Sequence, residues 1–189
     1  MFGAPGYSSR FDEAMALAVE AFRPVKRKAT GVPYLSHLMQ VCVTVTEFGG
    51  DEDLMIAALL HDYLEDIEGS SVQELERDFG ARVAELVLAL SDTTHRPKPP
   101  WRERKERYLS TLADKSEEVW LLCAADKLHN CRSLLRDHRA IGDEVFLRLA
   151  GKKDGTKWYY NAIVVALSAR WSHPLLDELR ADVKELLAL

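Results

Sequence analysis

The fold is decided by residues 57–66, which read Ala-Ala-Leu-Leu-His-Asp-Tyr-Leu-Glu-Asp. On a helix that advances about 100° per residue, one histidine and three carboxylates fall within an arc of about 140°. These four are His61, Asp62, Glu65 and Asp66. The preceding turn on that face holds two alanines, which leave room beside the polar side chains, and the flanking positions are apolar. The stretch predicts a helix that presents one acidic, histidine-containing face.

This polar face has two interpretations. A solvated helix surface usually pairs acidic with basic residues one turn apart, but this face has no lysine or arginine within reach. Like charges at such a spacing repel, so a cation is needed to gather them. We expect a bound metal ion, and a solvated amphipathic face is the alternative.

A further carboxylate lies in an otherwise apolar segment. Asp126 follows Ala124 and Ala125 in a long helix expected from residue 117 to about 136, and Asn130 is one turn further on the same face. A buried carboxylate is costly unless it is paired or bound to a metal. Asp126 is therefore either a metal ligand or a buried acid satisfied by an arginine or a helix cap.

The rest of the chain has helical periodicity. Start and stop signals predict helices at residues 11–22, 33–48, 51–66, 71–80, 81–90, 101–113, 156–169 and 174–189. Prolines make residues 91–100 a loop, and residues 151–155 read as a basic turn. Residues 42–46 are β-branched enough for a strand, but they lie between a proline start and a Gly-Gly stop that favour a helix. We expect one all-α domain over residues 1–189, a bundle of about eight to ten helices.

Composition narrows the class of protein. The chain has 189 residues, 47% of them hydrophobic, and a net charge of −5 from 25 basic and 30 acidic residues. This excludes disorder as the main state and argues against a nucleic acid polymer as partner, while a small anion remains possible. Three cysteines without a CxxC pattern argue for a reducing, cytoplasmic location. The sequence has no signal peptide and no apolar run of about 20 residues, so no membrane association is expected.

Three motifs together resemble the HD superfamily. They are Tyr-Leu-Ser-His at residues 34–37, His-Asp-Tyr-Leu-Glu-Asp at 61–66 and Ala-Asp-Lys-Leu-His-Asn-Cys-Arg at 125–132. They are similar to the pattern H…HDxxED…D, and most similar to small stand-alone RelA/SpoT-type alarmone hydrolases, from about residue 23 to about residue 160. A bare HD pair is weak evidence, whereas HDxxED between PYxxH and ADKxHNxR is a specific combination.

The resemblance implies a role for each matching residue. One divalent metal, usually manganese, would be held by His37, His61, Asp62 and Asp126. Glu65 and Asp66 match the pair that positions and activates the attacking water. Arg27 and Lys28 match a basic stretch that lines the nucleotide pocket, and the substrate-contacting positions correspond to Asn130 and Tyr159, with Tyr160 as the alternative to Tyr159.

Spacing alone leaves several of these positions open. His37 is not distinguished from the other histidines, and residues 26–28 read as a solvated loop without the resemblance. Lys152 and Lys153 fit a surface loop, with a second phosphate-facing turn as the alternative. We expect a solvated helix face from the four basic residues after the proline-rich loop, Arg102, Arg104, Lys105 and Arg107.

The implied activity is hydrolysis of the 3′-pyrophosphate of guanosine tetra- or pentaphosphate, or an adenosine analogue, to GDP or GTP plus pyrophosphate. Alternatives are an HD phosphatase for another small nucleotide such as NADPH, a non-catalytic nucleotide-binding HD module, or a helical scaffold. The chain departs from the family at Leu38, often proline, and at Tyr63-Leu64 and Ile67, commonly Thr-Val and Thr; Tyr63 puts substrate identity in question more than catalysis. At 189 residues we expect no synthetase beside the hydrolase, so the nucleotide signal is degraded and not produced.

Overall fold

The computed structural model describes residues 6–28 and 30–189. Within these residues the regular structure is helical, with one isolated bridge between Lys26 and Pro33 and no strand. The helices are α1 (Ser9–Ala21), α2 (Leu35–Glu47), α3 (Glu52–Leu60), α4 (Tyr63–Asp66), α5 (Val72–Phe79), α6 (Ala81–Leu90), α7 (Trp101–Leu112), α8 (Glu117–Ile141), α9 (Glu144–Leu147), α10 (Lys152–Ser168) and α11 (Pro174–Ala188). The predicted all-α fold is confirmed. The described residues form one helix more than the eight to ten expected, because the single-turn helices α4 and α9 are separate elements.

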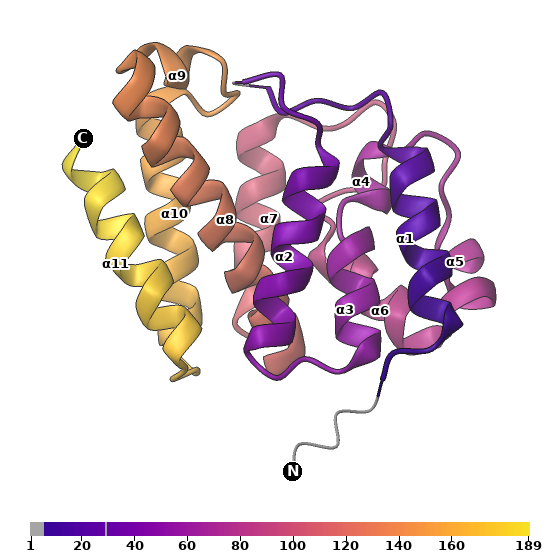
Figure 1. Ribbon diagram of the computed structural model, residues 1–189. Coiled ribbons are helices and arrows are strands. Elements are labelled where there is room, and N and C mark those ends of the chain that lie inside the picture. The colour runs from indigo at the N-terminus through magenta and orange to yellow at the C-terminus, as the bar shows by residue number, and fades with distance from the viewer. Residues whose placement is uncertain (1–5, 29) are drawn as a thin grey trace.

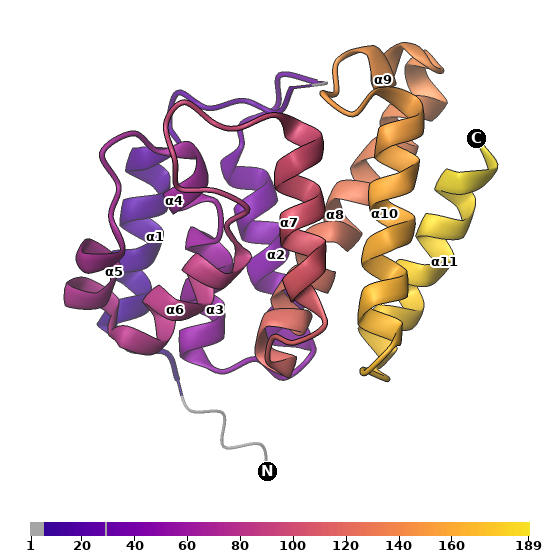
Figure 2. The same cartoon turned by 180° about the vertical axis from the view of Figure 1, so that it is seen from behind.

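The helices pack around α8, the longest of those described. α8 packs against α2 on one side and α11 on the other, while α3 lies between α2 and α6 (Figure 1). Seen from behind, α10 lies between α7 and α11 (Figure 2). Fully buried side chains such as Leu38, Ile56 and Leu122 fill the space where α2, α3 and α8 meet. This shared core fixes the three helices that supply the site described below.

The prediction of one helix over residues 51–66 is wrong in its second half. Asp51 caps the helix as its residue type predicts, because its Oδ1 accepts a hydrogen bond from the Leu54 N–H at 3.1 Å. However, α3 ends at Leu60, and His61 and Asp62 form a turn before α4 begins. The carboxylates of α4 therefore do not continue the face of α3.

Two other boundaries differ from those expected. α8 continues to Ile141, and α10 begins at Lys152, so the basic turn expected at residues 151–155 is mostly helical. Gly151 and Gly155 lie under the indole of Trp101, where a Cβ on Gly151 would come within 2.7 Å of the ring. The two glycines suggest a loop when read from the sequence, but in the structure they allow α7 and α10 to pack closely.

The β-branched residues 42–46 are helical, as expected from their flanks. Within α2, the hydroxyls of Thr44 and Thr46 donate to the carbonyls of Gln40 and Cys42 at 2.9 and 2.8 Å. These bonds satisfy the threonine hydroxyls inside the helix. The helix that carries His37 is therefore continuous.

Two observations concern the expected location. Cys42, Cys123 and Cys131 are buried and unpaired. None of the described helices is long and apolar enough to cross a bilayer.

Candidate functional site

Two imidazole nitrogens and a carboxylate meet where α2, α3 and α8 converge. His37 comes from α2, His61 follows the last residue of α3, and Asp126 lies midway along α8. Their ligand atoms all lie within 4.8 Å of one another, and Asp126 Oδ1 is 3.2 Å from His37 Nε2 and 3.7 Å from His61 Nε2. The histidines are 0% and 4% exposed, and neither Nε2 has a hydrogen-bond partner among the described residues. Buried nitrogens are rarely left unpaired, so this group suits a metal ion.

The other ring nitrogens orient the two histidines. His61 Nδ1 lies 2.8 Å from the carbonyl oxygen of Ala58, which only accepts, so Nδ1 carries a hydrogen and Nε2 is the nitrogen turned toward Asp62 and Asp126. His37 Nδ1 lies 2.7 Å from Nδ1 of His129. Burial and the neighbouring His37 lower the pKa of His129 to about 4, so its ring is neutral and can accept from His37. Both Nε2 atoms can then face a cation.

Asp62 stands beside this group. Its Oδ2 lies 3.0 Å from His61 Nε2 and 3.8 Å from His37 Nε2, and it accepts a hydrogen bond from the Tyr34 hydroxyl. Burial would raise the pKa of Asp62, but His61 holds it far below the usual range. Likewise, burial would lower the pKa of His61, but Asp62 and Asp126 raise it well above its ordinary value. The site therefore favours positive charge at its centre.

Asp126 keeps its charge through its neighbours on α8. Burial would raise its pKa, but Lys127 and the two histidines hold it well below the ordinary value. Its Oδ1 accepts from the Asn130 amide, and its Oδ2 contacts the Lys127 ammonium. Asp126 is thus a buried acid, as its position in an apolar segment predicts, and it is fixed on both oxygens.

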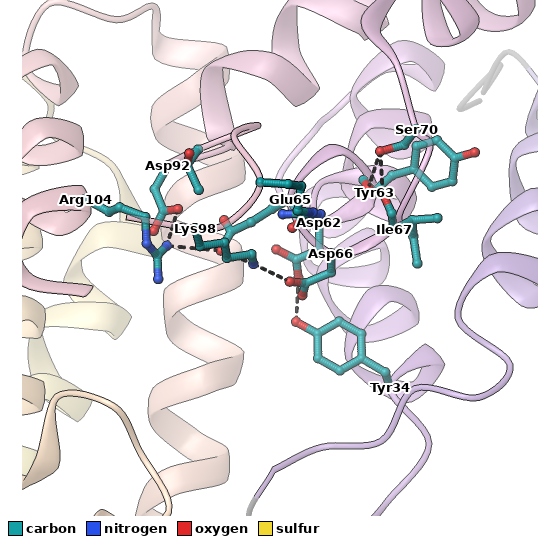
Figure 3. Close-up of polar contacts among 12 residues, drawn as sticks. Tyr34, Asp62, Tyr63, Glu65, Asp66, Ile67, Ser70, Asp92, Lys98 and Arg104 are labelled. Carbon is teal, nitrogen blue, oxygen red and sulfur yellow. Dashed lines mark hydrogen bonds and ion pairs between the residues drawn. The ribbon is translucent and has the colours of Figure 1, made fainter. Parts of the chain in front are cut away.

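Glu65 and Asp66 lie on α4, near Asp62 (Figure 3). Lys98, from the proline-rich loop, approaches Glu65 Oε1 to 3.3 Å and Asp66 Oδ1 to 2.7 Å. Burial raises the pKa of Glu65. The two carboxylates are thus engaged by a basic side chain that motif spacing did not indicate.

The expectation of a solvated basic face on α7 is half wrong. Arg102 and Arg107 are exposed and pair with glutamates one turn away. In contrast, Arg104 and Lys105 point inward and contact the buried Asp92. The sequence does not reveal this difference because Asp92 belongs to the preceding loop.

A pocket of about 410 Å³ opens beside the centre. Its lining includes the basic loop, parts of α8 and α9, and two residues next to the centre, Tyr34 and Asp66. Arg27 donates to Asn130 Oδ1 at 2.8 Å across this pocket. The structure thus brings Arg27, Lys28 and Asn130 together in one lining, and the basic loop is not simply solvated.

A family model for the HD domain matches residues 14–156, more than half of the chain. The chain belongs to the HD domain family. It is 35% identical over 133 residues to a guanosine-3′,5′-bis(diphosphate) 3′-pyrophosphohydrolase of Aquifex aeolicus, covering 69% of this chain and 18% of that protein. It is 36% identical over 127 residues to the human guanosine-3′,5′-bis(diphosphate) 3′-pyrophosphohydrolase MESH1, covering 66% of this chain and 69% of that protein.

Solved structures agree with the HD assignment. A metazoan ortholog of SpoT, described as hydrolysing ppGpp, superposes with a TM-score of 0.82 at 27% identity over 98% of this chain and 100% of that one. A crystal structure from Listeria monocytogenes EGD-e matches with a TM-score of 0.72 at 27% identity, covering 81% and 99%. The HD fold is therefore shared over nearly the whole chain.

Within this HD domain the two adjacent tyrosines of α10 have different surroundings. Tyr160 lines the pocket. Tyr159 instead packs against Trp101, and its ring lies 5.0 Å from the Lys105 ammonium. Of these two tyrosines, Tyr160 is therefore the one whose side chain reaches the pocket, since the two side chains leave the helix in different directions.

The basic pair at the start of α10 fits its surface interpretation. Lys153 pairs with Asp143 at 2.7 Å, and Lys152 donates to the carbonyl of Leu147 at 2.7 Å. Both lysines are thus engaged on the outside of the HD domain. Their contacts do not support a second phosphate-facing turn.

Sequence reasoning missed two neighbours of the HD centre. His129 supports His37, and Tyr34 binds Asp62, although both lie inside the quoted motifs. His129 is three residues after Asp126, which is a signal that it shares the inward face of α8. Tyr34 carried no such signal, because it precedes α2 and reaches Asp62 across the fold.

Proposed function

We propose that this chain is a metal-dependent pyrophosphohydrolase that releases the 3′-pyrophosphate of guanosine tetra- or pentaphosphate, or of an adenosine analogue. One observation carries the proposal: two buried histidine nitrogens and Asp126 face one another beside a basic pocket. The names of the bacterial and human relatives support the substrate class. We also propose that residues 1–189 act as a single hydrolase domain in the cytoplasm, which the three buried, unpaired cysteines support.

We assign the metal to His37, His61, Asp62 and Asp126. Two imidazoles and two carboxylates suit a divalent ion of borderline character, and we propose manganese because of the family resemblance. When bound, the ion lowers the pKa of water and offsets charge on phosphate oxygens. The unpaired Nε2 atoms and the two carboxylates of low pKa support this ligand set.

Glu65 is our candidate for the general base, with Asp66 orienting the water. A carboxylate whose pKa is raised by burial accepts a proton more readily than an exposed one. The water oxygen bonds to the phosphorus on the 3′ oxygen, the bond from that phosphorus to the 3′ oxygen breaks, and the 3′ oxygen gains a proton. Glu65 takes the proton that the water loses.

Pocket residues hold the nucleotide in this proposal. Arg27 can fork onto a phosphate and Lys28 adds a point charge. Asn130 lies between Arg27 and Asp126, where it can contact substrate next to the centre. The resemblance implies Tyr159 as the nucleoside contact with Tyr160 as the alternative, and we propose Tyr160 because its side chain lines the pocket.

A substrate panel tests the proposal. The purified chain with manganese is incubated with guanosine tetraphosphate, guanosine pentaphosphate, the adenosine analogue and NADPH, and pyrophosphate and phosphate are measured separately. We expect pyrophosphate from at least one of the first three. If NADPH is the one substrate of the panel that is hydrolysed, with release of phosphate, the chain is an HD phosphatase for another nucleotide. Tight nucleotide binding without turnover under any divalent metal supports a binding module.

A further inference from the structure

A buried carboxylate ties helix α7 to the loop that precedes it. The Asp92 side chain is 2% exposed, and Asp92 lies two residues after the end of α6. Its Oδ1 accepts from Arg104 Nη1 and its Oδ2 from Lys105 Nζ, so two consecutive cations of α7 converge on it. A buried ionic contact with both partners engaged is well ordered, because breaking it would leave a charge unpaired. Asp92 therefore fixes where the Arg104 guanidinium lies.

Arg104 reaches from this anchor to Glu65. Its Nε donates to the carbonyl of Pro99 at 3.1 Å, and its Nη1 lies 3.5 Å from Glu65 Oε1 (Figure 3). The guanidinium is planar and is held at both Nε and Nη1, so it cannot swing away from Glu65 without breaking these bonds. It is thus a rigid link between a buried anchor and the carboxylate.

We propose that Arg104, anchored by Asp92, is a positioning residue for Glu65; the role rests on the proposed function, in which Glu65 takes the proton of the water. Lys98 and Arg104 both contact Oε1, which leaves Oε2 to the water. The side chain of Lys98 is 31% exposed, whereas that of Arg104 is 10% exposed. Without Arg104, the Glu65 carboxylate can follow Lys98 out toward solvent.

The charged groups around Glu65 define what removal of Arg104 would change. The proline-rich loop contributes Lys98 and the Arg96 guanidinium, which donates to the main-chain oxygen of Glu65 at 2.6 Å. α7 contributes Arg104 and Lys105, and the facing carboxylates are Asp62 and Asp92. Loss of one cation from this set raises the pKa of the Glu65 carboxyl, because the charged form loses a favourable interaction.

The test compares Arg104→Gln with Arg107→Gln in the full chain with manganese. Arg107 lies on the same helix, is 52% exposed and pairs with Glu103 one turn away, so it is a matched control. For Arg104→Gln we expect kcat to fall roughly 10- to 100-fold with KM within about 2-fold. The acid limb of the kcat profile should move to higher pH, and Arg107→Gln should leave both unchanged.

Two further variants keep the test decisive. Asp92→Asn should lower kcat in the same direction by loosening the anchor, and Arg104→Lys should recover only part of the loss, because lysine keeps the charge but not the fork. If Arg104→Gln does not fold, these two variants carry the comparison. If Arg104→Gln loses thermal stability while the acid limb of its kcat profile does not move, Arg104 has a structural role and the proposal is overturned. A kcat of Arg104→Gln equal to that of Arg107→Gln would also overturn the proposal.

A measurement without turnover separates this inference from the proposed function. The carboxyl carbon of Glu65 is titrated by nuclear magnetic resonance in the wild type, Arg104→Gln and Arg107→Gln. We expect a higher titration midpoint in Arg104→Gln alone. An unchanged midpoint overturns the inference even in an active enzyme, whereas a wild type that releases no pyrophosphate overturns the proposed function alone.

Discussion

Asp126 is bound on both carboxylate oxygens, by Asn130 and Lys127, before any metal is considered. We expect Asp126→Ala to lose the metal, because it removes both a ligand and the charge that favours a cation. Asp62→Ala should behave in the same way. Metal content is measured by elemental analysis after dialysis, with Asp182→Ala on α11 as the control, since that side chain pairs with Arg132 away from the site. A full complement of metal in Asp126→Ala would contradict the ligand assignment.

His129 supports the centre without reaching it. We expect His129→Phe to weaken metal affinity by about 10- to 100-fold, because His37 loses the acceptor that fixes its ring. Calorimetric titration with manganese measures the change. His138→Phe, on the same helix where the half-buried ring pairs with Asp143 and not with a proposed ligand, is the control. Equal affinities in the two variants would show that His37 needs no support.

Glu65 is expected to act in chemistry and not in metal binding. Glu65→Gln should keep the metal and lose about 100-fold or more in kcat, since the amide cannot accept the proton. The same residue should set the pH dependence of kcat in the wild type. Burial raises the pKa of Glu65, so the active carboxylate form is present above that pKa and is lost as pH falls through it. The acid limb should therefore lie above the ordinary pKa of glutamate and be absent from the residual activity of Glu65→Gln.

At the residue scale, the sequence gives its clearest signals where the chemistry is local. The acidic face at residues 61–66 and the carboxylate at Asp126 stood out, because unpaired charge in an apolar segment needs a partner. His37 was selected only by resemblance, because a lone histidine carries no spacing signal. Arg104 was missed because its partner Asp92 lies on another element, and no pattern within α7 separates it from Arg107.

At the scale of elements, caps were predictable and the break after α3 was not. Asp51 and Ser71 cap α3 and α5 through bonds to N–H groups three residues on, which sequence rules anticipate. The turn at His61 and Asp62 accompanies contacts across the fold, including the bond from Tyr34 to Asp62. Helical periodicity therefore identifies the polar residues at 61–66, but it does not predict where their side chains point, because the turn interrupts the helix.

The seam between α7 and α10 gives a prediction about stability. Gly151→Ala should destabilise the fold by about 1–3 kcal/mol, because the new Cβ would lie 2.7 Å from the Trp101 ring and 3.1 Å from the Thr156 nitrogen. Urea unfolding measures the loss. Gly6→Ala is the control, since nothing lies within 4 Å of its added Cβ. A neutral Gly151→Ala would mean that the indole shifts freely.

For the whole molecule, the candidate ligands come from separate parts of the chain and join α2, α3 and α8. A metal that binds only the folded form stabilises it by about 2.7 kcal/mol at 100 times its Kd. We expect manganese to raise the melting temperature and a chelator to reverse the rise. Differential scanning calorimetry measures both changes. Asp126→Ala should show no such shift; a shift of equal size in that variant would place the ion elsewhere.

The bonds from Arg27 to Asn130 and from Asn130 to Asp126 have a thermodynamic consequence. A phosphate that draws Arg27 away removes the donor from the Asn130 oxygen, and Asn130 is bonded directly to a proposed ligand. Occupancy of the pocket and occupancy of the metal centre are then linked equilibria. Linkage is reciprocal, so whatever factor the nucleotide imposes on metal affinity, the metal imposes on nucleotide affinity.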